Sequence, residues 1–293
     1  AARRGADAII LDLEDSVAAS EKDRARTLVP EAAGVVSRGG ADAKVLREFD
    51  LTTRRFVEDG FALPEAKSDV DWIDANTLYV ATDFGPGSMT DSGYPRIVKR
   101  WQRGTPLADA VTVFEGQPQD VSAHVIVDRT PGYERTLFVR SLDFYHHETF
   151  LLQGDQLVRL DIPSDSSLGF MRDSLLLQIR SPLPVGTETF PAGSLLVADA
   201  SGYLSGERKL RALFTPSATR SLSGYTTTRA HIIVNVLDNV ASKLEQWHKR
   251  GSEFTFSTIK APFPGTLGVG SLYDALLPND PLANHYLLTG YKP

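Results

Sequence analysis

Residues 77–107, T-L-Y-V-A-T-D-F-G-P-G-S-M-T-D-S-G-Y-P-R-I-V-K-R-W-Q-R-G-T-P-L, decide which fold the rest of the chain indicates. Leu78, Val80 and Thr82 alternate with the residues of a second face, and this period of two predicts a strand with two unlike faces. A second strand is predicted over residues 96–102. The segment therefore predicts two strands joined by a long loop.

That loop, residues 85–95, contains three glycines and two prolines. Glycine supplies positive φ angles and proline a fixed φ, which an ordered loop uses and a helix does not tolerate. Long loops in compact domains are usually functional or disordered, and aromatic and proline residues at both ends favour a functional loop. Phe84, Gly85, Gly87 and Tyr94 are therefore the candidate functional residues of this loop.

Outward from this segment, short predicted strands separated by turn signals continue from residue 35 to the end of the chain. After a hairpin over residues 45–57, the predicted strands fall into groups: 72–82, 96–102 and 111–114; then 124–128, 136–140, 149–152 and 157–161; then 175–180, 194–198 and 210–214; then 231–237, 244–247, 254–259, 269–272 and 286–288. A pitch of roughly forty to fifty residues per group agrees with propeller repeats, and a sandwich is the other all-β option. The predicted fold class is all-β.

Residues 1–33 have a different pattern. The nearly continuous apolar run over residues 8–13 is typical of a strand buried on both faces of a parallel sheet. Ser20, with Asp23 three residues on, predicts a helix start, and Pro30 predicts its end. We therefore expect a short βα unit at the N-terminus and a domain boundary between residues 33 and 34.

Composition excludes several classes of protein. There are 31 Lys and Arg against 37 Asp and Glu, a net charge of -6 and no basic patch, so we expect no nucleic-acid partner. The absence of cysteine excludes disulfides, thiolate metal sites and a cysteine nucleophile. No apolar run approaches the ~20 residues of a membrane helix, so we expect no membrane partner. Without a visible signal peptide, a cytoplasmic and a periplasmic location both stay open.

Several stretches resemble the β-propeller domain of prolyl oligopeptidase-type serine peptidases, and the likeness extends over roughly residues 34–293. They are D-G-F-A-L-P-E-A-K-S (59–68), T-D-F-G-P-G-S (82–88), S-G-Y-P-R (92–96), W-Q-R-G-T-P-L (101–107) and V-G-S-L-Y-D-A-L-L-P-N-D-P-L-A-N-H-Y-L-L-T (269–289). The resemblance implies a seven-bladed propeller on an α/β-hydrolase domain, of which this chain holds about four or five blades. It further implies that the propeller admits only short peptides, which the hydrolase domain cleaves after proline, and that the loop at residues 85–95 gates substrate at a domain boundary or channel mouth.

The N-terminal stretches R-G-A-D-A-I-I-L-D-L-E-D-S-V and E-K-D-R-A-R resemble the start of the citrate lyase β-subunit and related Mg-dependent aldolases and lyases. That family folds as a TIM barrel, and one βα unit cannot close a barrel. Asp12 and Glu14 would project from one side of the strand, and carboxylates suit Mg²⁺. The alternative is that these acids are solvated at a strand end, and we name Asp12 and Glu14 only as a secondary metal hypothesis, with no cofactor expected otherwise.

The residues of a serine peptidase triad are not evident in this sequence. No serine lies in the pattern G-x-S-x-G that exposes a nucleophile on a sharp turn. His146, His147 and Glu148 resemble a metal cluster, but adjacent strand residues point to opposite faces, so a solvated turn is the favoured interpretation. Arg140 could project into a channel or toward a hydrolase domain. Aromatic residues could line a peptide channel, but packing between blades is more usual for Phe84, Tyr94, Trp101, Phe144, Tyr145 and Trp247.

The sequence thus favours the substrate-gating propeller of a peptidase, inactive by itself, with a hydrolase domain in cis and short peptides as partners. One alternative is a fragment of a Mg-dependent carbon–carbon lyase. Another alternative is a stand-alone interaction propeller. It is distinguished from the peptidase propeller by whether the coding DNA continues into a G-x-S-x-G segment.

Overall fold

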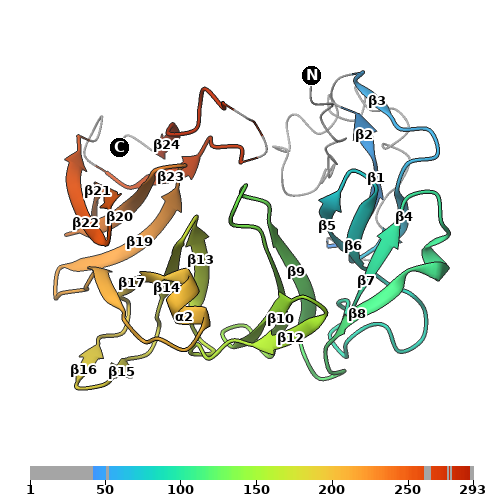
Figure 1. Cartoon of the computed structure of the whole chain (residues 1–293), viewed down its shortest axis with the longest axis horizontal. Helices are drawn as coiled ribbons and strands as arrows, with labels where there is room; N and C mark the ends of the chain where they lie inside the picture. The colour runs from blue at the N-terminus through green and yellow to red at the C-terminus, as the bar shows by residue number, and fades with distance from the viewer. Residues whose placement is uncertain (1–41, 51–52, 261–264, 276, 278, 291–293) are drawn as a thin grey trace. The chain divides into compact units, whose positions relative to one another are not determined.

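The computed structural model describes residues 42–50, 53–260, 265–275, 277 and 279–290, and Figure 1 shows their arrangement as strands. Within these residues the regular elements are nearly all β, as the sequence predicted; the exceptions are a 3-10 turn, Leu107–Asp109, and one short helix, α2 (Ala200–Leu204). The βα unit expected in residues 1–33, with Asp12 and Glu14, lies outside the described residues. No helix in the described part of the chain has both the length and the apolar character that crossing a bilayer demands.

Four four-stranded sheets make up most of the described chain, and strands that follow one another in sequence are neighbours within each sheet. Their strands are β5 (Asp69–Asp74), β6 (Thr77–Ala81), β7 (Ile97–Gln102) and β8 (Val111–Glu115); β9 (Ser122–Asp128), β10 (Arg135–Ser141), β11 (His147–Gln153) and β12 (Gln156–Arg159); β13 (Ser167–Met171), β14 (Ser174–Gln178), β17 (Leu195–Asp199) and β18 (Arg211–Phe214); and β19 (Arg220–Thr227), β20 (His231–Asp238), β21 (Ala241–Arg250) and β22 (Glu253–Ile259).

Four two-stranded sheets complete the fold. They are β1 (Lys44–Arg47) with β4 (Ala62–Ala66), β2 (Phe49–Asp50) with β3 (Arg55–Phe56), β15 (Leu183–Val185) with β16 (Glu188–Phe190), and β23 (Leu267–Ser271) with β24 (Tyr286–Gly290). The β15–β16 hairpin is an excursion between β14 and β17, which pair with each other in register from Ser174↔Asp199 to Gln178↔Leu195.

The middle strands of these sheets bury both of their faces. On β6, Leu78 and Val80 belong to one apolar cluster, whereas Tyr79 and Ala81 belong to another. The second cluster also contains Phe138 of β10, so the first two sheets pack face to face. A strand covered on both sides has no polar face, which is why β6 is almost continuously apolar. The two unlike faces predicted for this strand are in fact two buried faces.

The chain divides into two compact units. Unit 1 comprises the first two four-stranded sheets with the segment before them, and unit 2 comprises residues 160–293 with residues 128–135 from the tip of the β9–β10 hairpin. In unit 2 the third and fourth sheets pack through a cluster that joins Leu176 and Val197 to Ile232 and Val234. Each unit is therefore a pair of stacked four-stranded sheets with its own core.

Several strand predictions were wrong in detail. The strand predicted over residues 72–82 is two strands, because Asp74 Oδ1 accepts the backbone N–H of Asn76 at 2.7 Å and stabilises a tight turn. Strands β4, β13, β15, β16 and β19 were not predicted; β13 and β19 both contain glycine, which has low strand propensity. With β19 included, the fourth sheet ends at β22, and the predicted strands 269–272 and 286–288 correspond to the separate β23–β24 pair.

Candidate functional site

The first half of the loop between β6 and β7 is fixed by its own polar side chains. Asp83 Oδ1 accepts the backbone N–H of Gly85 at 2.8 Å. The Ser88 hydroxyl accepts the N–H of Phe84 at 2.8 Å and donates to the carbonyl of Gly85 at 2.7 Å. Gly87 has a φ of 81°, an angle that any residue with a side chain adopts only with strain. The loop therefore has one hydrogen-bonded conformation.

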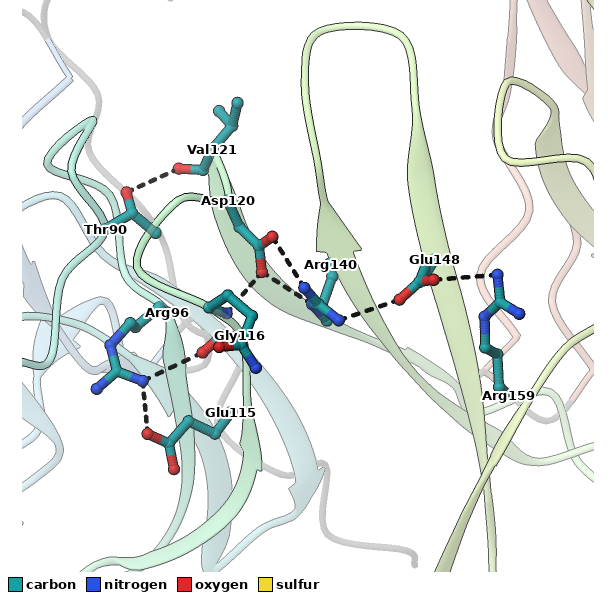
Figure 2. Close-up of polar contacts among 10 residues, drawn as sticks. Thr90, Arg96, Glu115, Gly116, Asp120, Val121, Arg140, Glu148 and Arg159 are labelled. Atoms are coloured by element: carbon teal, nitrogen blue, oxygen red, sulfur yellow. Dashed lines mark hydrogen bonds and ion pairs between the residues drawn. The ribbon is translucent and has the colours of Figure 1, made fainter.

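The second half of the loop is bound to the segment that begins the second sheet. Thr90 Oγ1 donates to the carbonyl of Val121 at 3.0 Å, as Figure 2 shows, and Thr90 N–H donates to the carbonyl of Tyr94 at 2.7 Å. The N–H of Ala123 donates to the carbonyl of Pro95 at 2.8 Å. These bonds place Tyr94 beside the start of β9.

The predicted loop residues therefore lie in different surroundings. Phe84 packs at the edge of the first apolar cluster, with the Lys99 ammonium 4.4 Å from its ring centre. Gly85, at a φ of 102°, and Gly87 shape the turn. Tyr94 lines a cavity.

That cavity, of about 300 Å³, is formed entirely within unit 1, and its wall is roughly half polar and half apolar. Its walls come from the start of β1, the β4–β5 turn, the end of the β6–β7 loop and the start of β9. The ionisable side chains that line it are Asp42, Lys44, Lys67, Asp69, Tyr94 and His124. We call it the polar cavity.

One side of the polar cavity is a self-contained cluster. The Tyr94 hydroxyl donates to Asp42 Oδ2 at 2.5 Å, and the Lys67 ammonium lies 3.6 Å from the same oxygen and 3.8 Å from the centre of the Tyr94 ring. The hydrogen bond from Tyr94 and the charge of Lys67 together hold the pKa of Asp42 below its ordinary value. Asp42 is therefore a carboxylate whose charge is already compensated.

The other side carries groups that are not compensated in this way. Among the described residues, the Lys44 ammonium and the Asp69 carboxylate have no side-chain hydrogen bond or salt bridge. Burial lowers the pKa of His124; the Asp69 carboxylate opposes this shift and His147 adds to it. His124 is therefore neutral at pH 7, and the cavity presents one ammonium and one carboxylate to a ligand.

Next to the loop, four charged side chains form a chain of ion pairs across the second sheet (Figure 2). Arg140 donates two hydrogen bonds to Asp120, from Nε at 2.8 Å and Nη2 at 3.0 Å, and a third to Glu148 at 3.1 Å. Arg159 pairs with the other oxygen of Glu148 at 3.0 Å. Arg140, which could have projected toward a channel or a hydrolase domain, is thus held between two carboxylates.

The Asp120–Arg140 pair predicts a pH-dependent stability. Burial raises the pKa of Asp120, but hydrogen bonds from Arg140 and from the N–H of Gln117 outweigh it, so the pKa lies below the ordinary value. The Asp120 carboxylate therefore stabilises the fold above pH ~4, the ordinary pKa of the unfolded state. This stabilisation is lost as the pH falls through the lowered pKa of the folded state. Asp120→Asn should therefore lower the free energy of unfolding by about 1 kcal/mol at pH 7.

The measurement is urea unfolding of wild type and variant at a series of pH values. The difference between the two proteins should narrow as the pH falls below ~4, because the unfolded wild type then takes up a proton at Asp120 and the folded wild type does so below its lowered pKa. A difference that stays constant from pH 7 to pH 3 would show that the Asp120 charge does not stabilise the fold.

The histidine pair and its neighbour do not gather around one point. His146 Nδ1 lies 2.8 Å from a carboxylate oxygen of Asp143 in the turn after β10, whereas Glu148 binds Arg140 and Arg159. In the described residues no three His, Asp or Glu side chains are placed to hold a metal ion. The turn interpretation fits His146, and His147 and Glu148 belong to β11.

Sequence reasoning missed five of the six ionisable cavity residues: Asp42, Lys44, Lys67, Asp69 and His124. They come from three separate strands or turns and form no spaced motif, so only the pairing of β1 with β4 and the fixed loop bring them together. Alternation along β9 gave one weak signal, because His124 occupies a polar position between the buried Ala123 and Val125.

Comparison with known proteins confirms both resemblances noted in the sequence. An uncharacterized peptidase of Sinorhizobium fredii is 32% identical over 249 residues, which cover 82% of this chain and 34% of that protein. An uncharacterized peptidase of Rickettsia prowazekii is 26% identical over 259 residues, covering 82% of this chain and 36% of that protein. This chain thus spans about a third of the length of the curated relatives it matches.

Solved structures agree on the fold. A post-proline cleaving enzyme from Rickettsia typhi matches with a TM-score of 0.73 and 24% identity, over 78% of this chain and 36% of that one. Oligopeptidase B from Trypanosoma brucei matches with a TM-score of 0.54 and 12% identity, over 79% and 31% of the respective chains. At these identities the likeness concerns the fold.

Residues 1–60 match the model of the HpcH/HpaI aldolase/citrate lyase family. The matched segment includes β1, β2 and β3, and β1 pairs with β4, which lies beyond it.

Proposed function

We propose that this chain, from about residue 34 on, is the propeller portion of a prolyl oligopeptidase-like serine peptidase. The chain would hold an incomplete part of a seven-bladed propeller. In the intact protein this propeller would be joined in cis to an α/β-hydrolase domain that hydrolyses short peptides after proline. The observation that carries the proposal is the TM-score of 0.73 with a post-proline cleaving enzyme, together with 32% identity to a peptidase. The stacked four-stranded sheets of each unit are the blades that such a propeller needs.

The contribution of the propeller would be steric selection of substrates. A gate that selects by size needs a rigid rim, and the hydrogen bonds of Asp83, Ser88 and Thr90 supply rigidity to the β6–β7 loop. We assign the rim to this loop, with Phe84, Gly85, Gly87 and Tyr94 as its gating residues, at a domain boundary or channel mouth. Gly87 keeps the turn tight and Tyr94 presents a polar aromatic edge.

The chain by itself should not hydrolyse peptides, since neither the sequence nor the described structure offers a nucleophilic serine. Ser88, the most enclosed serine of the loop, accepts the N–H of Phe84 and donates to the carbonyl of Gly85, so its hydroxyl is engaged with the loop backbone. We expect no release of chromophore from a chromogenic Gly-Pro peptide and no labelling by a serine-reactive probe. Turnover or labelling by the purified chain would overturn this assignment.

A second experiment tests the gating role directly. It fuses this chain to the part of the Sinorhizobium fredii peptidase that the chain does not match. We expect this fusion to cleave short proline peptides and to spare long unfolded chains, and the separate hydrolase part to lose this size preference. A fusion that cleaves long and short substrates equally would leave the propeller without the proposed gating role.

The match of residues 1–60 to the aldolase/citrate lyase family favours a second candidate, a Mg-dependent lyase fragment. Its ligands would be Asp12 and Glu14. Titration of the chain with Mg²⁺ tests it: binding that is abolished by Asp12→Ala or Glu14→Ala supports this candidate, and no binding by the wild-type chain ends it.

A further inference from the structure

The polar cavity of unit 1 has the features of a ligand site that the gating role does not require. Its volume of about 300 Å³ lies at the lower end of the ~300–1,000 Å³ range of small-molecule sites. The hydrogen-bonded β6–β7 loop and the β1–β4 pair hold its walls, so the cavity is preformed. A ligand of a few residues fits this space, whereas a folded protein segment does not.

Charge on the walls specifies the ligand further. Asp42 is compensated by Tyr94 and Lys67, which leaves Lys44 and Asp69 as the charged groups with unused binding capacity. With His124 neutral, the two ammonium groups and two carboxylates of the lining sum to zero charge. A cavity that is neutral overall but has separated charges of both signs favours a zwitterion over a simple anion or cation.

The backbone explains why these charges face the cavity. Ser68 lies between Lys67 and Asp69, and its buried hydroxyl bonds to Thr82 Oγ1 at 2.7 Å, which fixes the turn from which both neighbours project. Lys44 stands opposite Ala66 in the β1–β4 register, one residue before that turn. The ammonium of Lys44 and the carboxylate of Asp69 therefore come from adjoining backbone that is held in place.

We propose that the polar cavity binds a short zwitterionic peptide of two or three residues, with the peptide carboxylate at Lys44 and its ammonium at Asp69. The choice of a peptide as the zwitterion rests on the proposed peptidase function, whereas the requirement for both charges rests on the cavity. Such a site would retain or sense the small peptides that the intact protein handles.

Isothermal titration of this chain with the dipeptide Ala-Pro tests the proposal. We expect saturable binding that weakens about tenfold or more when the ligand is Ala-Pro amide, which lacks the carboxylate, or acetyl-Ala-Pro, which lacks the ammonium. Lys44→Met should weaken binding of Ala-Pro to a similar extent but leave the affinity for the amide unchanged. Asp69→Asn should weaken binding of Ala-Pro to a similar extent but leave the affinity for acetyl-Ala-Pro unchanged.

The matched control is Lys209→Met, which removes an 87% exposed lysine of unit 2 and should leave the affinity unchanged. Circular dichroism identifies a variant that does not fold. In that case the comparison of Ala-Pro with its amide and its acetyl derivative on the wild-type chain still tests the proposal. No binding of Ala-Pro at 10 mM (on the order of the weakest affinities that such titration resolves), or equal affinity for the dipeptide and its amide, would overturn the proposal.

These results are separable from the test of the proposed function. If the fusion enzyme shows size selection but the chain does not bind Ala-Pro, only the cavity proposal fails. If zwitterion binding follows the expected pattern but the fusion shows no size selection, the gating role fails and the binding site stands.

Discussion

Arg103→Met is expected to lower the free energy of unfolding of unit 1 by about 2–3 kcal/mol, because it leaves a buried carboxylate without its cation. Glu48 is 3% exposed, and both of its oxygens accept hydrogen bonds from Arg103, at 2.7 and 2.8 Å. Arg103 is about a quarter exposed, so the loss should be smaller than the ~3–5 kcal/mol found for fully buried pairs. Methionine keeps an apolar stem but removes the guanidinium carbon that lies 4.7 Å from the centre of the Phe61 ring.

The measurement is urea unfolding followed by tryptophan fluorescence in a Trp247→Phe background, which leaves Trp72 and Trp101 as reporters of unit 1. Adding Glu48→Gln to Arg103→Met should recover a large part of the loss, since the stranded charge is then removed. Arg159→Met is the matched surface control; its arginine is 60% exposed and should contribute under ~1 kcal/mol. Equal effects of the two arginine variants would contradict this account.

The Glu48–Arg103 pair also illustrates a limit of sequence reasoning. The partners are 55 residues apart, and no spaced motif links them. They meet because the N–H of Glu48 bonds to the carbonyl of Phe61 while Arg103 follows β7, which pairs with β6. Glu48 lies within the segment matched by the aldolase/citrate lyase family, yet its partner belongs to the first four-stranded sheet.

Strand positions were predictable where alternation and apolar character coincide. Residues 96–102, 111–114 and 149–152 were predicted as strands and correspond to β7, β8 and β11. Prediction failed where a polar side chain made the decisive local bond, as Asp74 does in the β5–β6 turn. It also failed at β19, whose Gly224 lies at a register shift that no propensity scale records.

The candidate site was predictable only in part, for a related reason. Glycine and proline identified the ordered loop, because their backbone preferences are local properties. The polar cavity depends on side chains from β1, the β4–β5 turn and β9, and long-range pairing decides that they meet. Of the predicted loop residues, Tyr94 reached this cavity because the loop bonds to the start of β9.

Phe138→Ala is expected to lower the free energy of unfolding of unit 1 by about 3–5 kcal/mol, the range for deleting a fully buried aromatic ring. Phe138 has no exposed surface, stacks on Phe114 at a centroid distance of 5.1 Å and meets the edge of Tyr79 at 5.4 Å. Its ring thus joins the second sheet to the first. Alanine would leave a cavity that the rigid strands on both sides fill poorly.

The same β10–β11 hairpin offers the control. Phe144 is 90% exposed at the hairpin tip, so Phe144→Ala removes an equal ring and should change the unfolding free energy by less than ~0.5 kcal/mol. Urea unfolding of both variants, in the same Trp247→Phe background, compares two identical substitutions six positions apart along the chain. Because the two differ only in burial, a loss in Phe138→Ala no greater than in Phe144→Ala would mean that the two sheets do not pack through this ring. The stacking of the two sheets, on which the proposed propeller depends, would then not rest on Phe138.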